Sequence, residues 1–119
     1  MIVAIPVDED QKSLCPSFGR APWMMFSDTE TGAQKILENP AAQAQGGAGL
    51  KAAQFVADQD AAALITVRCG ENAAKVLKAA GIAIYQSGAP EAAENLAALR
   101  EGRLSEMTRF HPGFVGGQP

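Results

Sequence analysis

The 119-residue sequence has only two cysteines, Cys15 and Cys69, and a single histidine, His111. Two cysteines are too few for the disulfide framework of a small secreted domain, so we expect free thiols in a cytoplasmic protein. The sequence has neither an HExxH motif nor a recognisable Ser–His–Asp set, and its one histidine lies in the C-terminal part of the chain. We therefore do not expect an enzyme.

Long apolar runs and basic stretches are also absent. No run approaches the roughly 18 apolar residues that span a membrane, so we expect no membrane partner. Residues 1–7 have no basic start and are followed by acidic residues 8–10, which is unlike a signal or transit peptide. Ten basic and 13 acidic residues give a formal charge of −3. Without a basic stripe, this balance argues against nucleic acid as the main partner.

What the sequence has is enough apolar material for one compact unit. Apolar residues make up 47% of the chain, and 23 of them are alanines, which suit closely packed helices. The length is typical of one domain. We predict a single domain over residues 1–102 and a C-terminal tail over residues 103–119 with little capacity to fold by itself.

Hydrophobic patterning predicts five strands and three helices. The predicted strands cover residues 2–7, 23–28, 33–38, 61–67 and 82–86. The predicted helices cover residues 49–59, 72–80 and 90–100, with Pro90 as the first residue of the third helix. Pro6 cannot donate a ladder hydrogen bond, so we expect it near the end of the first strand or where no donor is lost.

This order predicts an α/β fold with one mixed sheet and helices on both faces. The first three strands, joined by short turns, form an antiparallel meander. Residues 61–86 form a right-handed parallel crossover. If the first strand lies beside the fourth, the spatial order is 3-2-1-4-5. The chain order then changes direction between these two strands, where open sheets bind ligands.

The two cysteines lie in loops that leave the sheet at this point, within residues 8–22 and 68–72. Thiolates suit iron–sulfur clusters, copper and zinc. Cys69 precedes a predicted helix, whose dipole would lower the pKa of the thiol. The alternative is that both cysteines are small apolar residues of the core.

Three further features have a binding and a plain structural interpretation. Gly46-Gly47-Ala48-Gly49 before a helix suits an anion cradle, or is a flexible hinge. Arg20 and Arg68 would attract an anionic ligand, or are solvated. His111 is a candidate metal ligand, or a solvent-facing residue. The acidic residues 8–10 could hold a metal ion, as an acidic loop does in some nucleases. Few carboxylates follow the second and fourth strands in matching positions, so we interpret residues 8–10 as a solvated turn.

Two stretches resemble the dinitrogenase iron–molybdenum cofactor biosynthesis family. Residues 17–23, Ser-Phe-Gly-Arg-Ala-Pro-Trp, followed by Phe26-Ser27-Asp28, are similar to the family's HFGxAPxFxxxD-like segment. The second stretch begins with Gly47-Ala48-Gly49 and the strand over residues 62–67. It continues through Cys69-Gly70-Glu71-Asn72-Ala73 to Leu77 and Ala80-Gly81-Ile82. The resemblance covers about residues 1–100.

The resemblance implies a ribonuclease-H-like three-layer α/β/α fold. It also implies a non-enzymatic carrier of an iron–sulfur or iron–molybdenum-type cluster, with cluster donor or acceptor proteins as partners. We predict Ser17, Phe18, Gly19, Arg20, Gly47, Gly49, Arg68 and Gly70 as binding residues, and Cys15, Cys69 and His111 as metal ligands. Ser17 replaces the family's histidine, and Cys15 is a candidate to take its place. The alternative function is a protein-interaction module whose cysteines are structural.

Overall fold

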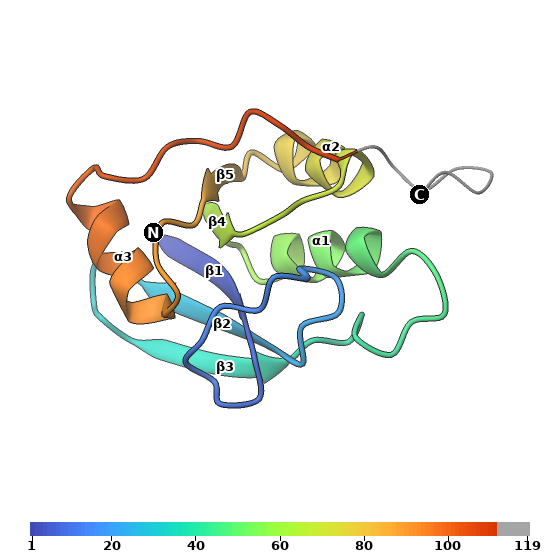
Figure 1. Cartoon of the computed structure of the whole chain (residues 1–119), viewed down its shortest axis with the longest axis horizontal. Coiled ribbons are helices and arrows are strands. Elements are labelled where there is room, and N and C mark those ends of the chain that lie inside the picture. The colour runs from blue at the N-terminus through green and yellow to red at the C-terminus, as the bar shows by residue number, and fades with distance from the viewer. Residues whose placement is uncertain (112–119) are drawn as a thin grey trace.

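The computed structural model describes residues 1–111, which form five strands and three helices (Figure 1). The strands are β1 (Ile2–Val7), β2 (Trp23–Asp28), β3 (Gln34–Glu38), β4 (Ala63–Thr66) and β5 (Ala83–Gln86). The helices are α1 (Ala48–Asp58), α2 (Glu71–Ala79) and α3 (Ala92–Arg100). Within the described residues, no helix is long and apolar enough to cross a membrane.

The five strands form one sheet in the order β3-β2-β1-β4-β5, which confirms the predicted topology. β1, β2 and β3 pair antiparallel, whereas β4 is parallel to both β1 and β5. β1 is therefore the central strand, and five of its six residues are buried. The point at which the chain order changes direction lies between β1 and β4, as expected.

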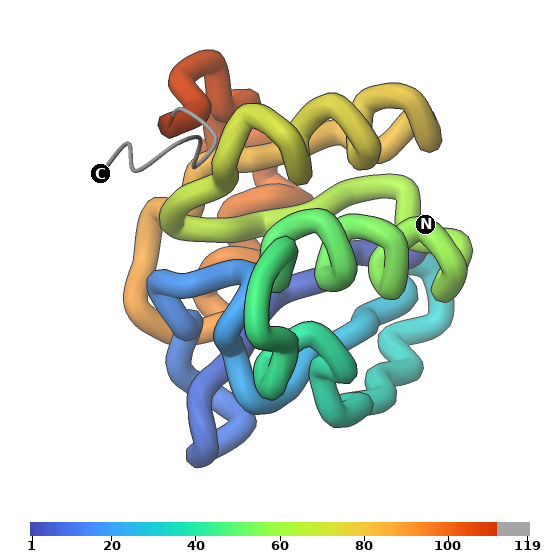
Figure 2. The backbone as a smooth tube through the Cα atoms, turned by 90° about the vertical axis from the view of Figure 1, so that its right-hand side faces the viewer, coloured from blue at the N-terminus to red at the C-terminus, as the bar shows by residue number. Residues whose placement is uncertain are grey.

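Helices cover both faces of the sheet, as a three-layer α/β/α fold requires. α1 and α2 lie side by side on one face, where Val56 and Leu77 pack over Leu64 (Figure 2). On the other face, Leu96 of α3 packs in a second cluster with Ile5. Many contacts of the first cluster come from alanines, which allow α1 and α2 to approach each other and the sheet closely.

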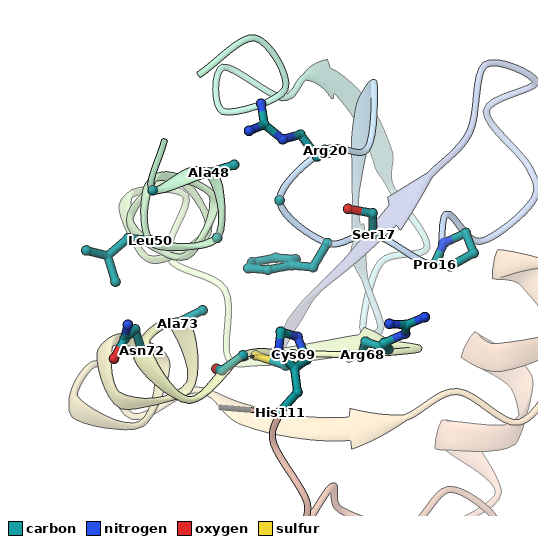
Figure 3. A pocket seen from close by; sticks show the side chains of 15 residues that line it. Pro16, Ser17, Arg20, Ala48, Leu50, Arg68, Cys69, Asn72, Ala73 and His111 are labelled. Carbon is teal, nitrogen blue, oxygen red and sulfur yellow. Dashed lines mark hydrogen bonds between the residues drawn. The ribbon is translucent and has the colours of Figure 1, made fainter. Parts of the chain in front are cut away.

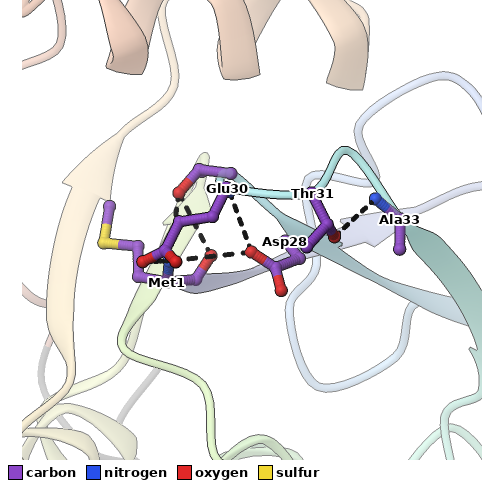
Figure 4. Close-up of polar contacts among 6 residues, drawn as sticks. Met1, Asp28, Glu30, Thr31 and Ala33 are labelled. Carbon is purple, nitrogen blue, oxygen red and sulfur yellow. Dashed lines mark hydrogen bonds and ion pairs between the residues drawn. The ribbon is translucent and has the colours of Figure 1, made fainter.

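The turn of the β2–β3 hairpin lies at the end of the sheet where β1 begins, opposite the end at which β1 and β4 leave the sheet. Its turn places Gly32 at φ +79°, a conformation that glycine adopts without strain. The N-terminal amine lies 3.8 Å from a carboxylate oxygen of Asp28 and 3.5 Å from one of Glu30 (Figure 4). These exposed ion pairs add little stability.

Two prolines show how local pairing decides strand and helix ends. Pro6 lies one residue before the end of β1 and beyond its last pair with β4, as expected, and its carbonyl accepts from the Cys15 amide. The prediction for Pro90 was wrong, because α3 begins two residues later. The Pro90 carbonyl accepts a hydrogen bond from Leu14, and Glu91 forms an antiparallel bridge with Ser13. This pairing keeps the residues before α3 extended.

Residues 103–111 run along β5 and reach the start of α2 (Figure 1). Gln86 donates to the Ser105 carbonyl at 2.9 Å, and Met107 donates to the Ile84 carbonyl at 2.8 Å. Met107 is only 8% exposed. We call residues 103–111 the C-terminal strap. The part of the predicted tail beyond residue 111 lies outside the described residues.

Candidate functional site

A pocket of about 660 Å³ opens where β1 and β4 leave the sheet (Figure 3). Four segments far apart in the sequence enclose it: residues 16–20, 47–50, 68–73 and the end of the C-terminal strap. Its lining consists of Pro16, Ser17, Phe18, Gly19, Arg20, Gly47, Ala48, Gly49, Leu50, Arg68, Cys69, Gly70, Asn72, Ala73 and His111. The pocket thus lies at the expected point of the sheet.

Close backbone packing forms one wall of the pocket. A Cβ atom at Gly19 would lie 2.7 Å from the Gly49 nitrogen and 2.9 Å from the Ala48 carbonyl carbon. Only glycine therefore lets the loop over residues 16–20 lie directly on the first turn of α1. Asn39 supports this loop from beneath, because its buried side chain donates to the Phe18 carbonyl at 3.3 Å.

Both α1 and α2 direct their N-terminal ends at the pocket. Gly47 precedes α1 in the left-handed conformation at φ +65°, and Gly70 precedes α2. Within the described residues, no side chain caps either helix. The first amides of a helix have no partner in the helix itself, and its N-terminus carries about half a positive charge. The glycine-rich segment before α1, of which Gly47, Ala48 and Gly49 line the pocket, thus has a counterpart in the start of α2.

The charged side chains of the lining are two arginines, on a protein whose formal charge is −3. The Arg20 guanidinium donates to the carbonyl oxygens of Ala42 and Ala44, which holds it over the loop that precedes α1. Arg68 is exposed at the end of β4, on the opposite side of the pocket in Figure 3. Together with the two helix ends, these side chains give the lining of the pocket a positive charge.

Cys69 lies at the inner wall of the pocket, and its side chain is only 2% exposed. Burial raises the pKa of its thiol to about 11, an effect that the charge of Lys78 only partly offsets. The sulfur atom lies 3.6 Å from the Gly70 carbonyl oxygen, to which it can donate. Our expectation of a lowered pKa was wrong, because removal of the thiol from water raises its pKa.

Cys15 does not line this pocket. It faces a separate hollow of about 520 Å³ that it shares with Asp8, Glu9 and Glu38. Burial, followed by its neighbour Asp8, raises the pKa of the Cys15 thiol. The expected meeting of both thiols in one site is thus not observed. Among residues 1–111, no three His, Cys, Asp or Glu side chains are grouped so that they could hold a metal ion.

The other candidate residues do come together. The eight predicted binding residues, with Cys69 and His111, all line the one pocket. Sequence reasoning did not single out Pro16, Ala48, Leu50, Asn72 and Ala73 as lining residues. The only sequence signal that could have identified these five residues is their position, since each lies within a few residues of a predicted binding residue. The acidic residues 8–10 lie in a turn in which Glu9 and Asp10 are exposed, and Asp10 accepts from Lys12 and Ser13.

Comparison with known proteins adds a family and a set of similar folds. Residues 1–102 match the family model described as dinitrogenase iron-molybdenum cofactor. The apo form of the orange protein from Desulfovibrio gigas is 27% identical, with 89% of this chain and 92% of that chain covered and a TM-score of 0.82. A NifB-like protein from Thermotoga is 35% identical, with 92% and 95% covered and a TM-score of 0.76.

A dinitrogenase-type protein from Methanocaldococcus jannaschii shares the fold, with a TM-score of 0.73 and 20% identity over 91% of this chain and 95% of that chain. No curated protein sequence matches the chain.

Proposed function

Because the chain belongs to the dinitrogenase iron-molybdenum cofactor family, we propose that it is a non-enzymatic carrier of an iron–sulfur or molybdenum-containing cluster. The family and the likeness to the orange protein support an accessory role associated with metal clusters. The cluster is cargo in this proposal, and the pocket between residues 16–20, 47–50 and 68–73 is where it binds.

One observation carries the proposal: two helix N-termini and two arginines line a single pocket. Each helix end contributes about half a positive charge, and each guanidinium contributes a full one. Metal–sulfide species such as tetrathiomolybdate are anions with several sulfur acceptors on their surface. Backbone amides and guanidinium groups donate to such acceptors without replacing any metal ligand. The volume of about 660 Å³ is typical of a small-ligand pocket.

The cysteines fit this picture as structural residues better than as ligands. A metal ligand must be a thiolate, and burial raises the pKa of both thiols. Cys15 also faces the other hollow. We therefore propose that amides and arginines hold the cluster. The thiolate hypothesis makes the opposite prediction for Cys15→Ser and Cys69→Ser, which should then lose binding.

A carrier requires a protein that supplies the cluster and a protein that accepts it, and we propose such donor and acceptor proteins as partners. The exposed positions of Arg20, Arg68 and Leu50 leave the pocket rim accessible to them. The two cysteines are free thiols in the described chain, which suits a reducing compartment, and we place the carrier in the cytoplasm.

The test is an anaerobic titration with tetrathiomolybdate, followed by its visible absorption and by equilibrium dialysis. Arg68→Gln should bind about 10-fold more weakly, the typical effect of losing one charge-assisted hydrogen bond. Arg100→Gln is the matched control, because Arg100 is an exposed residue at the end of α3, on the other face of the sheet. Cys15→Ser and Cys69→Ser should bind as the parent does. Equal binding by both arginine variants would refute the anion pocket.

The burial of both thiols also favours a second candidate, the protein-interaction module with structural cysteines. That function predicts no metal by elemental analysis after anaerobic expression and purification, and a defined partner in affinity capture. Molybdenum or iron retained by the purified protein in a fixed ratio would decide against it.

A further inference from the structure

We propose that His111 binds a metal ion of the cluster directly, and that the C-terminal strap is the part of the fold that presents it. This inference rests on the proposed carrier function and adds one coordinate bond to a site otherwise built from amides and arginines. The strap is thereby a component of the binding site.

Two backbone hydrogen bonds to residues 69 and 71 hold His111 in place. The His111 amide donates to the Cys69 carbonyl at 3.3 Å, and the His111 carbonyl accepts from the Glu71 amide at 2.9 Å. His111 thus forms a parallel bridge with Gly70, directly before α2. The preceding residue, Phe110, places its ring 4.4 Å from the Lys78 ammonium group. These contacts fix where the histidine enters the pocket.

The imidazole ring lies against Gly70 at the pocket wall. A Cβ atom at Gly70 would lie 3.1 Å from the ring carbon Cε1 and 3.6 Å from each ring nitrogen. Within residues 1–111, no side-chain hydrogen bond of His111 is found, and the residue is exposed. The thiol of the lining, Cys69, is only 2% exposed. His111 is therefore the accessible side chain of the lining that can bind iron or copper.

The positive surroundings determine which metal species the ring can bind. Arg68, Arg20 and the two helix ends repel a bare divalent cation, so His111 should not retain one. An anionic cluster is attracted, and its metal ions come within reach of the ring. A ring nitrogen then donates its lone pair to one metal ion, and a labile water or thiol leaves that ion. No electron is transferred in this exchange.

The presence of one histidine makes a direct test possible. The protein, purified without a histidine tag, is labelled with ¹⁵N-histidine and reconstituted anaerobically with ferrous iron and sulfide. Electron spin echo modulation of the dithionite-reduced cluster should show coupling to ¹⁵N, which can come only from His111. Iron-edge X-ray absorption, which needs no paramagnetic state, should show a nitrogen neighbour. Ferrous iron without sulfide should not be retained.

Two variants separate coordination from mere folding. His111→Ala should abolish the ¹⁵N coupling and release iron to a chelator at least about 10-fold faster than the parent. Gly70 itself has an ordinary extended backbone conformation, φ −76° and ψ 158°, so Gly70→Ala adds no backbone strain, but the new Cβ displaces the imidazole ring of His111. It should weaken the coupling. Thr108→Ala, an exposed strap residue, is the control and should behave as the parent.

The outcomes also distinguish this inference from the proposed function. The molybdenum of tetrathiomolybdate is already surrounded by four sulfides, so His111→Ala should bind this anion as the parent does. If tetrathiomolybdate binds in an Arg68-dependent way but the iron cluster shows no ¹⁵N coupling, the carrier function stands and His111 is not a ligand. If neither tetrathiomolybdate nor an iron–sulfide cluster binds the parent, both proposals are wrong.

Discussion

The contact between Gly19 and α1 predicts that Gly19→Ala destabilises the protein and damages the pocket together. The added Cβ would lie 2.7 Å from the Gly49 nitrogen, whereas uncompressed contacts of this kind begin near 3.5 Å. The loop and the first turn of α1 must therefore separate by roughly 0.8 Å. Both neighbours are backbone atoms, so no side chain can simply rotate away.

Overpacking of this kind costs about 1–3 kcal/mol. For a domain of this size, such a loss lowers the melting temperature by roughly 4–12 °C. The separation also moves the start of α1 away from the anion, so the affinity for tetrathiomolybdate should fall. Thermal unfolding followed by circular dichroism and an anaerobic tetrathiomolybdate titration measure the two effects.

Gly46→Ala is the matched control for the stability effect. It is the same chemical change in the loop before α1, but the added Cβ meets nothing within 4 Å and Gly46 does not line the pocket. Its melting temperature should equal that of the parent or rise slightly, because alanine restricts the unfolded chain. If Gly19→Ala melts within a degree of Gly46→Ala and binds tetrathiomolybdate normally, the close approach does not shape the pocket.

Three further predictions concern the rest of the fold. Asn95→Ala should lower the free energy of unfolding by about 2–4 kcal/mol, measured in urea, because the fully buried Asn95 bonds the backbone of residues 88, 89 and 91. Asp10 has its pKa lowered to about 2, first by the Ser13 hydroxyl, so its stabilising contribution is complete above pH 3.8 and is lost as the pH falls towards 2. The stability difference between the parent and Asp10→Ala should accordingly be constant from pH 7 to 4 and shrink below that; a difference that grows in acid would reverse the assignment. A chain ending at residue 102 should unfold at lower urea than one ending at 111, because it loses the buried Met107 and its backbone bond to Ile84; equal midpoints would show that the domain is independent of the strap.

The sheet was predictable because local and long-range signals agree in it. The buried run of β1, the glycine turn before β3 and the crossover from β4 to β5 each allow few arrangements, and together they give the order 3-2-1-4-5. Pro90 shows where such reasoning stops. Proline suits the first position of a helix, but extended pairing of residues 90–91 with 13–14 displaces the start of α3, and no local signal announces that pairing.

The site was predictable in location and only partly in chemistry. The change of chain direction correctly predicted where the pocket lies, and Gly47 and Gly49 of the glycine-rich segment line it, whereas anion binding there stays a prediction. The states of the thiols were not predictable, because burial depends on side chains that reach Cys69 and Cys15 from other segments. Residues 103–111 have weak strand propensity of their own, and their place along β5 follows from the unpaired edge that β5 offers.

The distribution of the pocket along the chain has a consequence for biosynthesis. Its lining comes from residues 16–20, 47–50 and 68–73 and from His111, which is the last lining residue to be synthesised. All five strands and all three helices precede the strap in the sequence, so they are synthesised before it. Cargo capture that depends on His111 would then be delayed until translation has passed the whole domain. Such timing would act as a checkpoint that keeps a reactive metal cluster away from incomplete chains.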